Sequence, residues 1–161
     1  MPGTPSPRRW LFLGVLIDVL TEPGAPVTVA EGIVPEGASP PAHVHADLDD
    51  SFYILDGRMV IRCGDEVCQA GSGSWVQFPA GVPHTFRVLG GRARVLLVHA
   101  DDSFLAAVRE IGLPVTGIDV PDAPQGLTIE ELDRAFAAHG IVNVGPPVEQ
   151  AEAERLTGQL A

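Results

Sequence analysis

Short stretches of apolar residues, bounded by glycine, proline or acidic residues, follow one another from residue 10 to residue 100. Within several of them apolar and polar positions alternate, which places every second side chain on one face of a strand. Short strands spaced in this way are typical of β-sandwiches and β-barrels. The pattern predicts strands over residues 10–21, 26–34, 42–46, 51–56, 58–63, 66–70, 74–78, 83–89 and 92–100.

A helical spacing of apolar positions begins after residue 100, with polar capping residues ahead of the first two apolar faces. The predicted elements are helices over 103–111, 128–139 and 149–157, a strand over 141–144 and a proline-rich connection over 113–126. We therefore expect one domain in three segments. Residues 1–9 form a loose arm, residues 10–100 form a β-barrel, and residues 101–161 form a helical extension that packs on the barrel.

The charge of the chain narrows the classes of function. Its 161 residues carry a formal net charge of −11 at pH 7, and every basic residue is an arginine. A lysine Schiff base or lysine general base is therefore excluded. Nucleic acids and anionic membrane surfaces both require a basic patch on the protein, so we expect neither as a partner.

The apolar run from Trp10 to Leu20 follows two arginines and superficially resembles an export signal. It is too short to span a membrane, contains Asp18 and lacks a small-residue cleavage site. We interpret it as a strand and predict a cytoplasmic protein.

Three of the five histidines, His43, His45 and His84, fall in two short patterns that indicate one metal site. Side chains two apart in a strand share a face at about 6.6–7 Å, so His43 and His45 can reach one ion. Asp50 and His84 would join them from neighbouring strands of a curved or closed sheet. Nitrogen and carboxylate ligands that converge in this way suit a catalytic divalent metal.

The spacing around these residues is regular over residues 37–88. The first pattern is Gly37, five residues, His43-Val44-His45, four residues, Asp50, six residues, Gly57, and the second is Gly73, five residues, Pro79-Ala80-Gly81, two residues, His84. Both resemble the signature motifs of the cupin superfamily, and the flanks resemble small single-domain cupins of the quercetin 2,3-dioxygenase type. The resemblance implies an all-β, double-stranded β-helix (jelly-roll) barrel with short C-terminal helices, and His43, His45, Asp50 and His84 as metal ligands.

Two positions depart from the family pattern, because Asp50 replaces a glutamate and Val88 replaces an asparagine. Aspartate is one methylene shorter, so Asp50 has three possible roles: direct ligand, ligand through a water, or catalytic base beside a three-histidine site. Asp47 and Asp49 are alternative ligands in the same loop. The set suits one divalent ion: Fe, Mn, Ni, Cu or Zn.

Strand parity places candidate substrate-binding residues around the metal. Phe52 and Ile54 share a face with Asp50, and Phe86 and Val88 share one with His84. Gln77 is a candidate polar contact if its face is turned to the cavity. Such a pocket suits a small, largely apolar organic substrate. We interpret His99, at the end of an apolar strand, as a core or edge residue.

The leading functional hypothesis is an oxygenase whose substrate chelates the metal through hydroxyl or carbonyl oxygens. One alternative is a metal-dependent isomerase, cyclase or dehydratase of the kind linked to polyketide chemistry, with the ion as a Lewis acid. Another is a non-catalytic module that binds a metal or a small ligand. The apolar outer strands suggest a homodimer.

Overall fold

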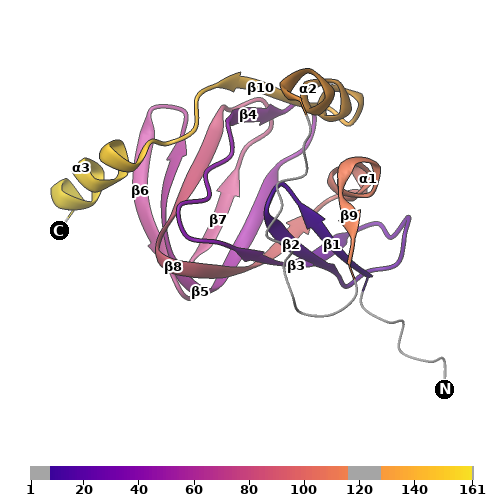
Figure 1. Ribbon diagram of the computed structural model, residues 1–161, viewed down its shortest axis with the longest axis horizontal. Coiled ribbons are helices and arrows are strands. Elements are labelled where there is room, and N and C mark those ends of the chain that lie inside the picture. The colour runs from indigo at the N-terminus through magenta and orange to yellow at the C-terminus, as the bar shows by residue number, and fades with distance from the viewer. Residues whose placement is uncertain (1–7, 116–127, 161) are drawn as a thin grey trace.

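The computed structural model describes residues 8–115 and 128–160 (Figure 1). This part of the chain forms strands β1 (Arg8–Phe12), β2 (Val15–Val19), β3 (Thr28–Val34), β4 (Ala42–His45), β5 (Asp50–Cys63), β6 (Glu66–Gly71), β7 (Trp75–Phe78), β8 (His84–His99), β9 (Leu113–Pro114) and β10 (Ile141–Gly145). Its helices are α1 (Ser103–Ile111), α2 (Ile129–Ala138) and α3 (Gln150–Leu160). All the strand pairings are antiparallel, and the fold is the expected jelly roll.

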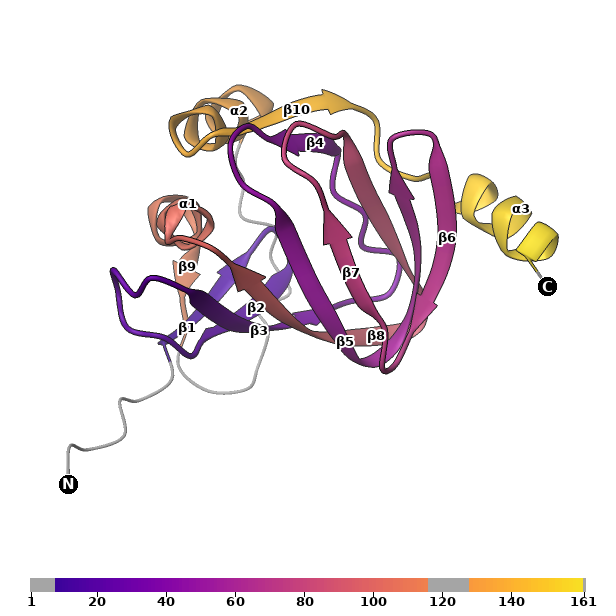
Figure 2. The same cartoon turned by 180° about the vertical axis from the view of Figure 1, so that it is seen from behind.

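Two long strands, β5 and β8, form the ribbon around which the barrel is built (Figure 2). They pair with each other near both ends, from Phe52 with Leu97 to Cys63 with His84. On either side of the ribbon, β8 pairs with β3 and β4, while β5 pairs with β6 and β7. On the β8 side the strands follow the order β10-β4-β8-β3-β2-β1-β9.

The sequence predicted a break at residue 57 and another at residues 90–91. The structure instead has one continuous strand at each place, with a bend where the break was predicted. Gly57 has a φ of 99°, and a Cβ there would lie 2.8 Å from the backbone of Ala93. The pairing between β5 and β8 shifts register at this point, so residues 90–93 lie opposite Gly57 alone. Both strands consequently change the face that they turn to the interior.

The first predicted strand is instead a hairpin of β1 and β2. Leu13 and Gly14 both have positive φ angles, 50° and 81°, as a two-residue type I′ turn requires. Leucine rarely adopts this conformation, so the apolar pattern gave no sign of a turn. The predicted arm at 1–9 is wrong in its last two residues, because β1 begins at Arg8 and Arg9 forms an ion pair with Asp18 at 2.6 Å. The rest of that prediction, residues 1–7, lies outside the described ranges.

The apolar core has two main parts. One fills the inside of the barrel, around residues such as Phe52, Ile54 and Val88. The other joins β1, β2 and β3 to the first two helices through Leu105, Val108 and other buried side chains. Helices α1 and α2 therefore cover one end of the barrel, while α3 lies at the opposite end near β6 (Figure 1).

The predicted cap of α2 is present, and at α1 one of the two acidic residues ahead of the helix supplies the cap. Thr128 accepts a hydrogen bond from the Glu131 backbone and the Glu131 side chain accepts one from Thr128, which completes the capping box. At α1 the carboxylate of Asp101, and not Asp102, accepts the backbone N–H of Ser103 at 2.9 Å. None of the helices in the described ranges has the length and apolar character that a membrane crossing requires.

Candidate metal centre

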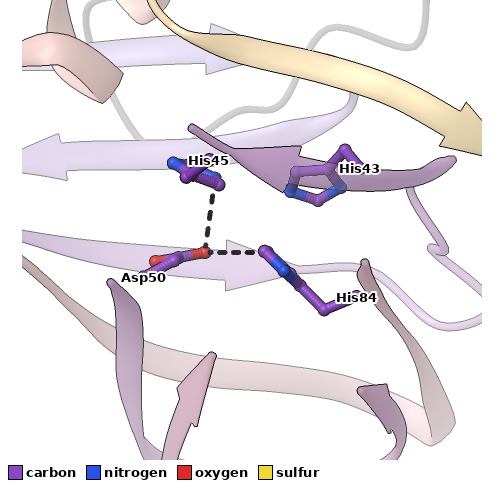
Figure 3. Close-up of side chains that lie close together, drawn as sticks. All are labelled: His43, His45, Asp50 and His84. Atoms are coloured by element: carbon purple, nitrogen blue, oxygen red, sulfur yellow. Dashed lines mark ion pairs between the residues drawn. The ribbon is translucent and has the colours of Figure 1, made fainter. Parts of the chain in front are cut away.

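Four side chains from three strands converge inside the barrel (Figure 3). His43 and His45 belong to β4, Asp50 begins β5 and His84 begins β8. One ligand atom of each lies within 4.8 Å of the others. Direct pairing of His43 with His84 brings the two sequence patterns together, and the alternation of β4 sends His43 and His45 to the same side.

The backbone fixes the orientation of two imidazole rings. Nδ1 of His43 lies 2.9 Å from the carbonyl oxygen of Pro41, and Nδ1 of His84 lies 2.9 Å from that of Val82. A carbonyl oxygen only accepts, so each Nδ1 carries the proton and each Nε2 keeps a free lone pair. This tautomer is the one in which Nε2 can bind a metal.

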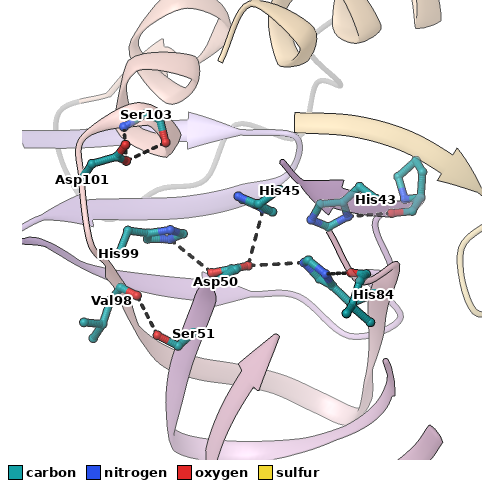
Figure 4. A network of polar contacts seen from close by, with 11 residues as sticks. His43, His45, Asp50, Ser51, His84, Val98, His99, Asp101 and Ser103 are labelled. Atoms are coloured by element: carbon teal, nitrogen blue, oxygen red, sulfur yellow. Dashed lines mark hydrogen bonds and ion pairs between the residues drawn. The ribbon is translucent and has the colours of Figure 1, made fainter. Parts of the chain in front are cut away.

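Asp50 reaches the cluster despite its short side chain. Its Oδ2 atom lies 3.8 Å from Nε2 of His45 and 3.7 Å from Nε2 of His84. Its Oδ1 atom faces the other way and lies 3.4 Å from Nε2 of His99 (Figure 4). The aspartate is therefore placed between the ligand cluster and a fourth histidine.

The alternative carboxylates lie away from the cluster. Asp47 is exposed. Asp49 is also exposed and accepts hydrogen bonds from the Ala80 backbone N–H at 2.9 Å and from Gln77 Nε2 at 2.7 Å. Both of its oxygens are thereby occupied on the outside of the barrel.

The protonation states suit metal binding. Burial lowers the pKa of His45 to about 4 and also lowers the pKa of His43, so both rings are neutral at neutral pH. Burial raises the pKa of Asp50, but its interactions with His84, His99 and His45 lower this pKa by more, so the net direction is downward. Neutral imidazoles beside an ionised carboxylate are the ligand forms that a divalent metal requires.

Unpaired polar atoms test whether a metal fits. Asp50 Oδ1, His84 Nε2 and His99 Nε2 are buried and have no hydrogen-bond partner among the described residues. Leaving such atoms unpaired is costly, and a cation bound beside His84 would satisfy its lone pair. Three imidazole nitrogens and one carboxylate oxygen form a suitable donor set for zinc, iron, copper, nickel or manganese.

A cavity of about 470 Å³ adjoins the cluster. The chain has six phenylalanines, and all six line this cavity: Phe12, Phe52, Phe78, Phe86, Phe104 and Phe136. Among the described lining residues, Asp50 supplies the only carboxylate and no arginine is present. Its ionisable side chains are the cluster and His99, so a bound molecule would meet charge only there.

The predicted substrate-binding residues divide into two groups. Phe52 and Phe86 line the cavity, while Ile54 and Val88 are buried in the barrel core and do not line it. Gln77 lies on the exposed face of β7 and donates to Asp49, because Val76 and Phe78 occupy the inward positions of that strand. The prediction that Gln77 contacts the substrate is therefore wrong.

His99 is the site residue that sequence reasoning missed. It is only 4% exposed, lines the cavity and stacks on Phe104 at a ring-centroid distance of 4.8 Å. Pairing of Phe52 with Leu97 places His99 beside Asp50 two residues further along. This register could have revealed His99 as a neighbour of Asp50. It cannot be derived from the sequence, because the bends at Gly57 and residues 90–93 interrupt the pairing of β5 with β8.

A jelly-roll barrel with a three-histidine, one-aspartate cluster inside it defines the class of the molecule. A family model described as a cupin domain matches residues 30–99. Over these residues the chain is therefore similar to the cupin superfamily.

Individual relatives share limited parts of the chain. Quercetin 2,3-dioxygenase of Bacillus subtilis is 28% identical over 108 residues, which cover 66% of this chain and 32% of that enzyme. The chain spans between 32% and 54% of the length of the curated relatives it matches.

Solved structures agree on the fold. A single-site variant of the oxalate decarboxylase of Bacillus subtilis superposes with a TM-score of 0.52 at 23% identity, over 63% of this chain and 29% of that one. The cupin domain of Schizosaccharomyces pombe Cnp3 superposes with a TM-score of 0.50 at 20% identity, over 62% and 73%.

Proposed function

We propose that the protein is a metal-dependent oxygenase acting on a small, largely apolar organic substrate that chelates the metal. The observation that carries the proposal is the joining of the ligand cluster to a cavity lined by every phenylalanine of the chain. Similarity to a quercetin 2,3-dioxygenase supports the reaction class. Aromatic walls with polar groups at one end suit a planar molecule with one oxygen-bearing edge.

The chain's own residues have distinct roles in this proposal. His43, His45, His84 and Asp50 would hold the ion, which when bound supplies Lewis-acid activation and redox chemistry. Four protein ligands leave positions open on an octahedral ion for substrate oxygens. Phe52, Phe86 and the other phenylalanines would bind the substrate rings and exclude water from the reacting edge.

Oxygen dependence tests the proposal. The protein is loaded separately with Fe(II), Mn(II), Ni(II) and Cu(II) and incubated with flavonols, catechols and 1,3-diketones, in air and under nitrogen. We expect substrate loss in air with matching dioxygen uptake and both oxygen atoms in the organic product, so that no external reductant is consumed. No turnover of any of these substrates, or turnover that is equal under nitrogen, would contradict the oxygenase.

Zinc distinguishes the second reaction type. Zinc does not change its oxidation state, so it cannot support the redox step of an oxygenase. Full turnover with zinc under nitrogen would instead indicate an isomerase, cyclase or dehydratase in the same cavity. Metal binding without turnover of any substrate would favour the non-catalytic module.

The assembly and location of the protein belong to the same proposal. We infer a homodimer, because large apolar side chains such as Tyr53, Leu55 and Trp75 are exposed on the outer face of β5 and β7. Light scattering at micromolar concentration tests this state, and a monomer mass would contradict it. The cytoplasmic location stays a prediction, which cell fractionation tests.

A further inference from the structure

Asp50 presents its two carboxylate oxygens to different partners (Figure 4). Oδ2 faces His45 and His84 at 3.8 and 3.7 Å, which is the ligand side. Oδ1 faces His99 Nε2 at 3.4 Å, on the opposite side. His99 itself is outside the group of four candidate ligands that lie within mutual reach.

The pairing of Asp50 with His99 is enclosed by protein. Asp50 Oδ1 and His99 Nε2 are both buried, and each lacks a hydrogen-bond partner among the described residues. They are therefore each other's available complement, one an acceptor and the other able to carry a proton. Their 3.4 Å separation exceeds the roughly 2.7–3.2 Å of an N–H···O hydrogen bond by a few tenths of an ångström, so a small shift of either side chain would form one.

His99 is held both at its ring and at its backbone. It stacks on Phe104 of α1 with an angle of 10° between the ring planes. Its backbone is fixed in the ladder between β8 and β3, where it pairs with Thr28. A side chain fixed in this way can restrain the carboxylate that it faces.

We propose that His99 is a positioning residue, whose Nε2–H donates to Asp50 Oδ1 and so directs Oδ2 towards the ion held by His43, His45 and His84. The proposal rests on the metal site of the proposed function and not on the reaction. The proposal also explains how the short side chain of Asp50 can serve as a ligand. His99 would hold Asp50 Oδ1 on the side away from the ion, and groups that support ligands in this way contribute to metal affinity.

Metal affinity without substrate provides the test. Zn²⁺ binding to the metal-free protein is measured by calorimetry for the wild type, His99→Leu and His99→Gln. We expect His99→Leu to weaken binding roughly 10–100-fold, the usual effect of losing a group that supports a ligand. His99→Gln should recover most of the loss, because the glutamine amide can donate from a position close to Nε2. The visible spectrum of bound Co²⁺ should change in His99→Leu and return in His99→Gln.

A double substitution separates positioning from other roles. If His99 acts through the carboxylate, His99→Leu should cause no further loss of Zn²⁺ affinity in an Asp50→Ala background. An undiminished loss in that background would overturn the proposal and identify His99 as a ligand or a structural residue. Equal Zn²⁺ affinity of His99→Leu and wild type would also overturn it.

Controls keep these outcomes interpretable. His139→Leu is the matched substitution, since His139 lies at the end of α2, pairs with Glu110 and does not line the cavity. It should leave Zn²⁺ affinity unchanged. Thermal melts of the metal-free variants identify any that fail to fold; should His99→Leu fail, His99→Ala takes its place with the same expected loss of affinity. Failure of the wild type to bind Zn²⁺ would contradict the proposed metal site itself.

Discussion

Two backbone carbonyls decide which nitrogen of His43 and of His84 faces the cluster. The rings are therefore oriented before any ion arrives, and their Nε2 atoms need no rearrangement to bind. His84 is further fixed by Phe78, whose ring stacks on it with a centroid separation of 4.2 Å. Such preorganisation favours tight binding, since less freedom is lost on association.

Removing one imidazole should therefore abolish tight metal binding. We expect His43→Ala to lower Zn²⁺ affinity by more than the roughly 10–100-fold typical of groups that only support ligands. His43 is half-buried, so the variant should still fold. Calorimetry measures the change, and His139→Ala is the control. Affinity within a factor of about three of wild type would remove His43 from the ligand set.

The lowered pKa of His45 has a consequence for the metal-free protein. Burial lowers this pKa to about 4, whereas the ordinary value of 6.5 applies to the unfolded chain. Between these values the unfolded state binds more protons, so the free energy of unfolding falls as the pH is lowered from 6.5 towards 4. Burial lowers the pKa of His43 as well, which acts in the same direction.

Urea unfolding of chelator-treated protein at pH 7 and pH 5 measures this effect. We expect a smaller free energy of unfolding at pH 5, and a weaker pH dependence in His45→Asn. Equal stability at the two pH values would show that the folded protein accepts these protons without cost.

At the scale of elements, the bends within the long strands were harder to predict from the sequence than the positions of the strands. Most strands and all three helices lie close to the ranges that the apolar pattern predicts, because burial on one face determines both. The pattern could not show that β5 and β8 are continuous, since a glycine that bends a strand looks like one that ends it. It also missed the turn at Leu13, which local preferences oppose.

The same reasoning explains how much of the candidate site the sequence revealed. His43 and His45 share a face through simple alternation, and the spacing of the two patterns brought in Asp50 and His84. Tertiary packing alone brings Phe104 and Phe136 to the cavity and His99 to Asp50. No local spacing in the sequence encodes those contacts.

The bend of β5 should be especially sensitive to substitution of Gly57. Alanine there would place a Cβ 2.8 Å from the Ala93 backbone, at a φ of 99°. We expect Gly57→Ala to lower the free energy of unfolding by at least about 1–3 kcal/mol, the usual cost of one strained residue. Gly158→Ala in α3, where a Cβ meets nothing within 4 Å, is the matched control and should be neutral or stabilising. Denaturant titration compares the two, and equal effects would contradict a special role for the bend.

At the scale of the whole molecule, the site joins parts of the chain that are distant in sequence. Strands β4, β5 and β8 supply the candidate ligands, and α1 and α2 supply Phe104 and Phe136 to the cavity. A ligand that binds only the folded state stabilises all of these contacts together. Metal binding should therefore be visible in global stability.

Chelation tests this linkage. At a free zinc concentration 100-fold above Kd, binding should add about 2.7 kcal/mol to the free energy of unfolding. For a domain of this size that corresponds to a rise in Tm of roughly 5–11 °C. We expect EDTA to lower the Tm, zinc to restore it, and His43→Ala to show neither change. A Tm indifferent to both reagents would indicate that the folded protein binds no zinc.

Both ends of β8 touch the same carboxylate, with His84 at its first residue and His99 at its last. A straight strand of 16 residues would hold its ends about 50 Å apart, so β8 is bent back sharply between them. The spacing between these two histidines is consequently set by the bend at Gly90 and Gly91, near the middle of β8. Selection for a different preferred ion could therefore act on those glycines, and could retune the coordination sphere while every donor side chain keeps its identity.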